Sequence, residues 1–280
     1  MALKRYKPTT QSIRKMTCVD YSGLSKKGPE KSLLRSNHRS VGRDNRGRIS
    51  TRHKGAGAKR LYRLISNLGQ KFGEVATVKA IEYDPNRTAF IALVEYPNKQ
   101  KAYIICPEGL KIGSQVKADN KTDLVVGNRM PLKNIPSGTE IHDIELIPGR
   151  GKGQIVKSAG SHAVVAAQAE GSGKRAKYLQ IKLPSGEIRL IHNECFASIG
   201  KVSNPDNSAV RYAKAGRIRH MGIRPSVRGK AMNPNSHPHG GGEGVNPIGL
   251  KYPKTPWGKH AMGKKTRRKK YSNKFIVRRK

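Results

Sequence analysis

Hydrophobic and polar positions divide this chain into a strand-like middle and two irregular ends. From Glu74 to about Gly200, short runs rich in valine, isoleucine and tyrosine are separated by turn signals that contain proline, glycine, asparagine or aspartate. Such runs are typical of β-strands, because branched and aromatic side chains fit a pleated, half-buried surface. The middle contains no long stretch with a helical period, so the pattern predicts an all-β fold.

A first group of strands is expected within residues 74–130. The Asp84–Arg87 sequence, with proline at its second position, is a turn signal between the first two runs. Residues 131–138, with a proline at the start and another near the end, indicate a boundary. The expected strands are Val75–Tyr83, Ala89–Tyr96, Lys101–Cys106 and Ile112–Ala118.

A second group of strands is expected within residues 131–200. Apolar residues alternate cleanly in Tyr178–Leu183, and the Pro-Ser-Gly-Glu sequence after it leads into Ile188–His192, as in a hairpin. The other expected strands are Thr139–Ile147, His162–Ala169 and Phe196–Val202. Short strands at regular spacing indicate barrels or sandwiches, and two groups of about 60–70 residues favour two small barrels over one large one.

Charge follows the same division of the chain. The sequence has 57 lysine and arginine residues against 18 acidic residues, a formal net charge of +39. By region, the net charge is +14 over residues 1–60, +6 over 61–200 and +19 over 201–280. The expected organisation is a basic N-terminal extension at 1–73, barrels at 74–130 and 131–200, and a Gly- and Pro-rich basic C-terminal extension at 201–280.

So large a positive charge predicts a polyanionic partner, and nucleic acid fits best. Segments rich in glycine, proline and arginine cannot fold alone, so both extensions are expected to take their shape from that partner. Fifteen aromatic residues in 280 are too few for single-strand stacking platforms. The sequence has no amphipathic recognition helix for duplex DNA. These observations favour folded RNA, recognised through its phosphates and its shape.

The same sequence disfavours several other classes of protein. No run approaches the roughly 20 apolar residues that span a bilayer. A secretory signal is not visible, and a cleaved transit peptide is disfavoured because the first residues lack an amphipathic helix. The phosphate-loop motif GxxxxGK[ST] is missing. Cys18, Cys106 and Cys195 are far apart and odd in number, which predicts ordinary thiols in a reducing compartment rather than disulfides or a zinc site.

Several motifs resemble those of the bacterial ribosomal protein L2 family along nearly the whole chain. The most specific are RPSVRGKAMNP at 224–234 and HPHGGGEG at 237–244, supported by GRISTRHKGAGAKRLYR, IEYDPNR, TPWG and the terminal KFIVRRK. The resemblance implies an oligonucleotide-binding-type barrel followed by an SH3-like barrel, with two extensions buried in large-subunit ribosomal RNA. It also implies a structural, non-enzymatic role in subunit assembly and association, tRNA binding and peptide-bond formation.

The resemblance and the basic motifs together nominate residues that contact RNA. In the family, the arginine of the Asp-Pro-Asn-Arg turn and a basic residue after the Gly-rich loop contact RNA from the two barrels. They fall here on Arg87 and Lys157, and lysine lacks the planar fork of a bidentate contact. The other candidates are Arg46, Arg48, Arg52, His53, Lys59, Arg60, Arg63, Arg217, Arg219, Arg224, Arg228, His237, His239, Lys264, Lys265, Arg267 and Arg268.

Two departures from the family pattern concern the extensions. The family usually has aspartate where Ser236 precedes His237, so the imidazole lacks an acidic partner. Packing of His237 and His239 at an RNA turn is therefore favoured over general-base catalysis or zinc binding. Ala56 and Ala58 interrupt the family's glycine run, so any close backbone approach there must accommodate a methyl group.

The expected partners are large-subunit ribosomal RNA, neighbouring ribosomal proteins and the small subunit at an intersubunit bridge, with no membrane and no homo-oligomer. No cofactor or protein-bound metal is expected, apart from magnesium ions associated with the RNA. The expected location is a ribosome in the cytoplasm, with an organelle ribosome as the alternative. Two competing hypotheses are an RNA-processing enzyme built on the histidine cluster and a DNA-compacting architectural protein.

Overall fold

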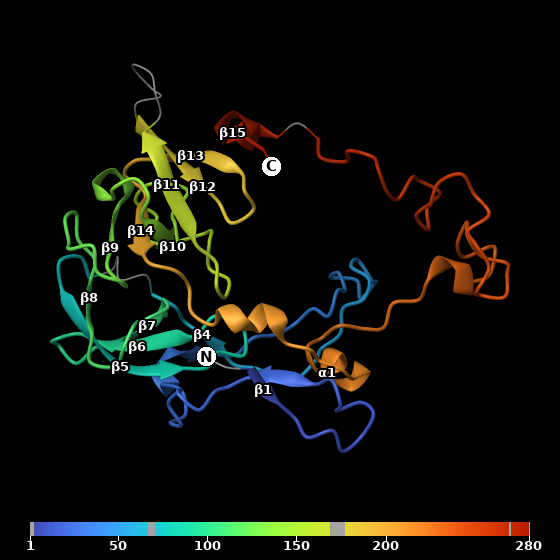
Figure 1. The fold of residues 1–280 in the computed structure, drawn as a ribbon, viewed down its shortest axis with the longest axis horizontal. Helices are drawn as coiled ribbons and strands as arrows, with labels where there is room; N and C mark the ends of the chain where they lie inside the picture. The colour runs from blue at the N-terminus through green and yellow to red at the C-terminus, as the bar shows by residue number, and fades with distance from the viewer. Residues whose placement is uncertain (1–2, 67–70, 169–176, 269, 280) are drawn as a thin grey trace. The chain divides into compact units, whose positions relative to one another are not determined.

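The chain is organised as two units, each assembled from segments that are distant in sequence. The computed structural model describes residues 3–66, 71–168, 177–268 and 270–279 (Figure 1). The first unit, here called the barrel unit, comprises residues 1–38, 59–214 and 272–280. The second, here called the basic unit, comprises residues 39–58 and 215–271. Both parts of the basic unit are therefore connected to the barrel unit at each of their ends.

The first sheet of the barrel unit contains four antiparallel strands in the order β7-β6-β5-β8. They are β5 (Val75–Glu82), β6 (Ile91–Glu95), β7 (Lys101–Ile105) and β8 (Gln115–Lys117). Val78, Val94, Ile104 and Val116 are buried in one apolar cluster with their neighbours. All four strands were expected from the sequence, and each is shorter than its apolar run by one to four residues.

The second sheet contains seven strands in the order β15-β13-β12-β11-β10-β14-β9 (Figure 1). Its core includes Met130, Ile141, Ile181 and Ile191, all almost fully buried. The strands are β9 (Arg129–Pro131), β10 (Glu140–His142), β11 (Ala163–Gln168), β12 (Tyr178–Lys182), β13 (Ile188–His192), β14 (Phe196–Ile199) and β15 (Ile276–Arg278). The all-β prediction is confirmed.

The remaining elements are short. Two small sheets pair β1 (Leu3–Arg5) with β2 (Thr17–Val19) and β3 (Leu34–Arg35) with β4 (Tyr62–Arg63). The described helical segments are η1 (Lys31–Leu33), η2 (Leu132–Asn134), η4 (Pro205–Ala209), α1 (Ala215–His220), η5 (Gly229–Ala231) and η6 (Tyr271–Phe275). In the described parts of the chain, no helix is long and apolar enough to cross a membrane.

Several elements differ from the sequence-based expectation. The run Thr139–Ile147 forms a strand only as far as His142, because Asp143 adopts a left-handed conformation (φ 48°) that turns the chain. Strand β9 begins two residues before the expected boundary and pairs with β14 of the second sheet. These strands are short, so hydrophobic alternation carries little signal for them.

Both ends of the chain contribute to the barrel unit, although the sequence predicted irregular extensions there. Val19 and Leu24 are buried in the apolar cluster of the first sheet. At the other end, β15 pairs with β13, and the rings of Tyr178 and Phe275 lie 5.8 Å apart. Isolated apolar residues among basic ones give no periodic pattern, which is why these contacts were not expected.

The two sheets of the barrel unit are joined by a short segment after β14. Val202 is buried with Ala89 and Ile105 in a small apolar cluster. The backbone N–H of Ser203 donates to the carbonyl of Cys106 at 3.1 Å, and its hydroxyl accepts from the N–H of Phe90 at 3.2 Å. This segment therefore fastens the end of the second sheet to the first.

A network of buried charges lies inside the second sheet. Arg129 is 1% exposed, and its guanidinium donates to Glu145 Oε1 at 2.9 Å and to the carbonyl oxygen of Asp143 at 2.8 Å. Asp143 Oδ2 lies 3.3 Å from the same guanidinium, and Ser198 Oγ accepts at 3.2 Å. Neighbouring His142 is also buried, and desolvation lowers the pKa of its imidazole. Because burying an unpaired charge is costly, the arginine and the two carboxylates depend on one another.

The three cysteines are buried free thiols. Burial raises the pKa of Cys106 and of Cys195 to about 12. At neutral pH both are therefore protonated and poor nucleophiles.

Candidate nucleic-acid interface

The Asp84–Arg87 turn is held by a set of internal contacts in the barrel unit. Asp84 is fully buried, and its carboxylate accepts from Arg87 Nε at 2.5 Å. Arg63, which is 9% exposed, places its Nε 4.0 Å from the same carboxylate. Arg60 donates to the carbonyl of Pro85 at 2.6 Å. Three of the predicted RNA-binding arginines therefore stabilise this turn from within the protein.

Arg63 and Arg87 have little free surface for a ligand. Their side chains are 11% and 16% exposed, and both face the same buried carboxylate. Lys59, by contrast, is an exposed residue of the same segment. Contact of Arg63 and Arg87 with RNA stays a prediction. Their observed partner, Asp84, indicates that they also fix the shape of the turn.

Lys157 lies beside the loop that follows the buried charge network. Its Nζ donates to the carbonyl of Gly153 at 2.9 Å and lies 3.6 Å from Asp143 Oδ1. Its side chain is 36% exposed, so part of it is accessible. A lysine can satisfy both contacts as a point charge, and the planar fork of arginine is not required here.

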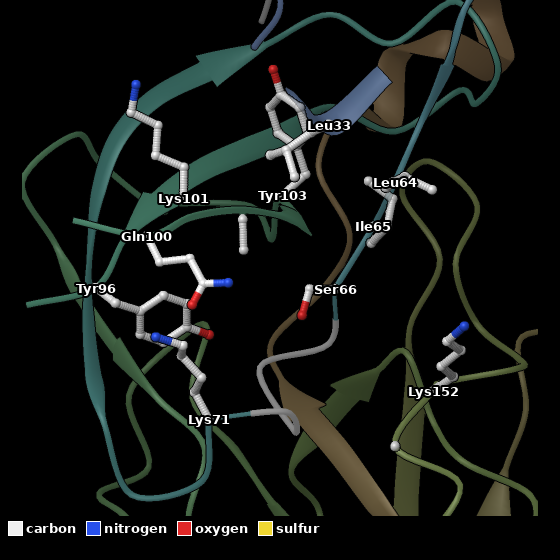
Figure 2. A pocket seen from close by; sticks show the side chains of 12 residues that line it. Leu33, Leu64, Ile65, Ser66, Lys71, Tyr96, Gln100, Lys101, Tyr103 and Lys152 are labelled. Carbon is white, nitrogen blue, oxygen red and sulfur yellow. The ribbon is translucent and has the colours of Figure 1, made fainter. Parts of the chain in front are cut away.

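The barrel unit also contains a cavity of about 490 Å³ beside strand β7 (Figure 2). Lys71, Lys101 and Lys152 are among the residues that line it. Lys101 donates to Glu30 at 2.7 Å, which raises the pKa of the lysine. Lys71 lies 3.5 Å from a carboxylate oxygen of Glu74 and also over the ring of Tyr96, as Figure 2 shows. Because two of these three lysines are paired with carboxylates, the cavity is not a strong site for phosphate.

The basic unit has a much stronger excess of positive charge. Its sequence contains 20 lysine and arginine residues, and its acidic residues are Asp44 and Glu243. The buried apolar clusters of the described residues all belong to the barrel unit. The basic unit is therefore held by hydrogen bonds and ring contacts rather than by an apolar core.

Two segments that are about 165 residues apart in sequence pair within the basic unit. Gly55 N–H donates to the carbonyl of Gly222 at 2.8 Å, and Ala58 N–H donates to that of His220 at 2.9 Å. In the other direction, Arg224 N–H donates to the carbonyl of His53 at 3.1 Å. The two basic extensions, which were predicted from the sequence as separate segments, are thus joined by backbone hydrogen bonds.

Gly57 is the position in this pairing where the backbones approach most closely. Its φ is +66°, and a Cβ atom there would lie 2.6 Å from the carbonyl oxygen of His220 and 2.7 Å from Gly222 N. Ala56 and Ala58 on either side are exposed, so their methyl groups are accommodated. The family's glycine run is therefore interrupted only at positions where this fold tolerates a side chain.

Substituting Gly57 with alanine is expected to break this pairing. Gly47 has a similar φ of +75° but nothing within 4 Å of an added Cβ, so Gly47→Ala is a matched control for backbone strain alone. Losing two backbone hydrogen bonds worth about 0.5–1.5 kcal/mol each should speed amide exchange at Gly55 and Ala58 by about 10-fold or more. Hydrogen exchange on the full chain measures this effect. Equal exchange in the two variants would show that the close approach is unimportant.

His237 and His239 form a packed pair with defined hydrogen bonds. His237 is 8% exposed, and its Nδ1 accepts from the backbone N–H of His239 at 3.0 Å. The Nε2 of His239 accepts from the N–H of Lys254 at 2.8 Å. The two rings lie 4.7 Å apart, and a Cβ atom at Gly229 would overlap the His237 ring. Both imidazoles therefore use one nitrogen to hold the local backbone, and the buried His237 is badly placed to act as a general base.

Most of the remaining predicted RNA-binding residues lie on the surface of the basic unit. His53 Nδ1 lies 3.1 Å from the carbonyl oxygen of Pro225, and Arg217 is half-buried. The exposed residues are Arg46, Arg48, Arg52, His53, Arg219, Arg224, Arg228, Lys264, Lys265, Arg267 and Arg268. In the described residues, no group of three or more histidine, cysteine, aspartate or glutamate side chains could hold a metal ion.

One aromatic residue of this surface was not among the RNA-binding residues predicted from the sequence. Trp257 is 70% exposed, and the guanidinium carbon of Arg52 lies 5.1 Å from its ring centre. The two residues are about 200 positions apart in sequence, so no local pattern could have joined them. In the sequence, Trp257 is part of the Thr-Pro-Trp-Gly family motif, which by itself assigns no contact to the ring.

The fold and its basic surface define the class of this protein. Two small β-sheet domains joined to a cationic unit, whose described residues form no apolar core, are the features of an RNA-binding structural protein. Two family models match the chain: Ribosomal Proteins L2, RNA binding N-terminal domain, over residues 30–118, and Ribosomal Proteins L2, C-terminal domain, over residues 125–258.

The chain belongs to the ribosomal protein L2 family. It is a structural, RNA-binding protein of the large ribosomal subunit. The expected oligonucleotide-binding-type and SH3-like barrels are confirmed by the match and by the two sheets. The alternatives of an RNA-processing enzyme and a DNA-compacting protein are not supported.

Proposed function

We propose that the basic unit is the main anchor of this protein in large-subunit ribosomal RNA, and that the barrel unit makes secondary contacts. The observation that carries this proposal is the charge of the basic unit, which has 20 lysine and arginine residues against two acidic residues and shows no apolar core among its described residues. Such a surface is stabilised when phosphates replace its counterions. Fractionation of cell extracts tests this: the protein should sediment with large subunits and leave them only at high salt.

We further propose that this anchoring supports subunit assembly and association, tRNA binding and peptide-bond formation without catalysis by the protein. The proposed neighbours are ribosomal RNA, adjacent ribosomal proteins and the small subunit at an intersubunit bridge. We propose no homo-oligomer and no cofactor of the protein's own, and magnesium ions at the interface would be held mainly by the RNA. The proposed site of action is a cytoplasmic ribosome, where buried free thiols such as Cys106 stay reduced.

Replacing His237 with alanine is expected to reduce the yield of assembled large subunits. The substitution removes the acceptor for the His239 N–H and leaves a void beside Gly229, a local cost of about 1–3 kcal/mol. Subunits that do assemble should form peptide bonds at close to the normal rate. Subunit yield is measured by gradient sedimentation, and the peptide-bond rate by single-turnover assay on the isolated subunits.

His220→Ala is the matched control, because that histidine side chain is exposed in the same unit. It should leave both measurements unchanged. Normal assembly of His237→Ala subunits combined with lost peptide-bond formation would contradict the non-catalytic proposal.

A further inference from the structure

A short hairpin in the basic unit presents the tryptophan of this chain at its tip. Lys254 and His260 form an antiparallel bridge, and Ala261 N–H donates to the carbonyl of Pro253 at 2.9 Å. Within the turn, Thr255 N–H donates to Lys259 O at 2.7 Å and Gly258 N–H to Thr255 O at 2.9 Å. These bonds fix the backbone on both sides of Trp257.

The hairpin is also attached to the histidine pair. Lys254 N–H donates to His239 Nε2 at 2.8 Å, and His239 N–H in turn donates to the buried His237. Because the base of the hairpin is held in this way, an aromatic ring at its tip is presented with little loss of conformational freedom on binding.

The environment of Trp257 is unusual for an indole. The residue is 70% exposed, and it projects from a unit that is otherwise strongly cationic. Exposed tryptophan is costly in water, because the ring is among the largest apolar groups of a protein. The guanidinium of Arg52 stacks at 5.1 Å from the ring centre and covers one face. With so much of the residue exposed, the other face is open.

A second aromatic group lies at the base of the same hairpin. Tyr252 is 51% exposed, and its ring lies 5.1 Å from that of His260. Lys251 Nζ lies 5.7 Å from the tyrosine ring centre. Lys254 and Lys259 carry further positive charge along the hairpin. Open aromatic faces between cations match a strand of nucleic acid, whose bases stack while its phosphates contact lysine and arginine.

We propose that Trp257 stacks on an unpaired nucleobase of the ribosomal RNA, with Arg52 held against the opposite face of the indole. The base must be unpaired, because both faces of a base within a duplex are covered by its neighbours. The proposal rests on the RNA-binding function of the basic unit. It adds a contact to a nucleobase, whereas the cations on the rest of the surface are proposed to contact phosphates.

Fluorescence gives a direct test, because the sequence contains one tryptophan. The full-length protein is titrated with single-stranded poly(A), with duplex poly(A)·poly(U) and with polyphosphate, and binding is followed in parallel by filter retention. Single-stranded RNA should quench the tryptophan emission strongly, whereas polyphosphate should bind with little quenching. The quenching by the duplex should be close to that by polyphosphate. Equal quenching by all three polyanions, or binding of poly(A) without quenching, would overturn the proposal. Failure of every polyanion to bind would instead contradict the proposed anchoring function.

Affinity of variants for poly(A) gives an independent readout. Trp257→Ala should weaken binding by about 5- to 150-fold, the change that corresponds to one stacked base. Trp257→Phe should keep most of the affinity, since it keeps an aromatic face. Val245→Ala is the control, because that residue is 76% exposed in the same unit, has no aromatic ring and lies outside the hairpin. A Trp257→Ala variant that binds like the wild type, or no worse than Val245→Ala, would overturn the proposal.

Discussion

Replacing Arg129 with alanine is expected to lower the free energy of unfolding of the barrel unit by about 3–5 kcal/mol. The substitution leaves the carboxylates of Glu145 and Asp143 buried without the guanidinium that now contacts both. It also removes donors to Ser198 Oγ and to the carbonyl of Asp143. Urea titration followed by far-UV circular dichroism measures the change in β-structure. Tryptophan emission is unsuitable here, because Trp257 belongs to the basic unit.

Two further variants separate the cost of leaving a buried charge unpaired from the change in stability that removal of any arginine would cause. Arg189 forms a partly exposed ion pair with Glu187 at 3.7 Å, so Arg189→Ala should change stability by about 1 kcal/mol or less. The triple variant Arg129→Met, Asp143→Asn, Glu145→Leu removes the charges together and should recover much of the lost stability. An Arg129→Ala variant as stable as Arg189→Ala would show that the network contributes little.

The strands of the two sheets could be predicted because their side chains are buried in regular positions. Ile188–His192 was predicted with the bounds that the structure has, since a turn signal precedes it and its apolar residues fit a half-buried strand. Strands β9 and β15 could not be predicted in the same way. Each has three residues, and each is a strand only because a partner elsewhere in the chain pairs with it.

The basic residues of the candidate site could be nominated from sequence, but their individual roles could not. Arg63 and Arg87 look like any other cations in the sequence, and only the fold shows that they contact the buried carboxylate of Asp84. The stacking of Arg52 on Trp257 is likewise a contact between distant segments. Composition therefore indicated a polyanionic partner, whereas the distinction between internal and outward-facing cations required the structure.

The pairing of residues 53–58 with residues 220–224 changes the picture of two independent arms. A single unit formed from both segments presents its cations together, and the hydrogen bonds of Gly55, Ala58 and Arg224 restrict its backbone before RNA is bound. Restriction of this kind lowers the entropic cost of binding. That the extensions take their shape from RNA stays a prediction. Because of the internal pairing, fewer backbone degrees of freedom of the protein are left to be ordered when RNA binds.

Substituting the cationic block at the end of the basic unit is expected to have the largest effect on RNA affinity. The variant replaces four exposed residues with glutamine, namely Lys264, Lys265, Arg267 and Arg268. If each neutralises one phosphate, the slope of log K against log salt should become shallower by about 3–4, because each contact contributes roughly 0.7–0.9. At 0.1 M salt the affinity for large-subunit ribosomal RNA should then fall by about 10³-fold.

A charge-matched control distinguishes these contacts from a general loss of positive charge. The control replaces four exposed lysines of the barrel unit with glutamine, namely Lys111, Lys121, Lys133 and Lys182. Both variants lose the same net charge, so long-range attraction falls equally in each. Only the variant in the basic unit should lose a large part of the salt dependence, since counterions are released where phosphates are contacted directly. Equal slopes in the two variants would mean that the protein is held by diffuse charge, and that the basic unit is not its anchor.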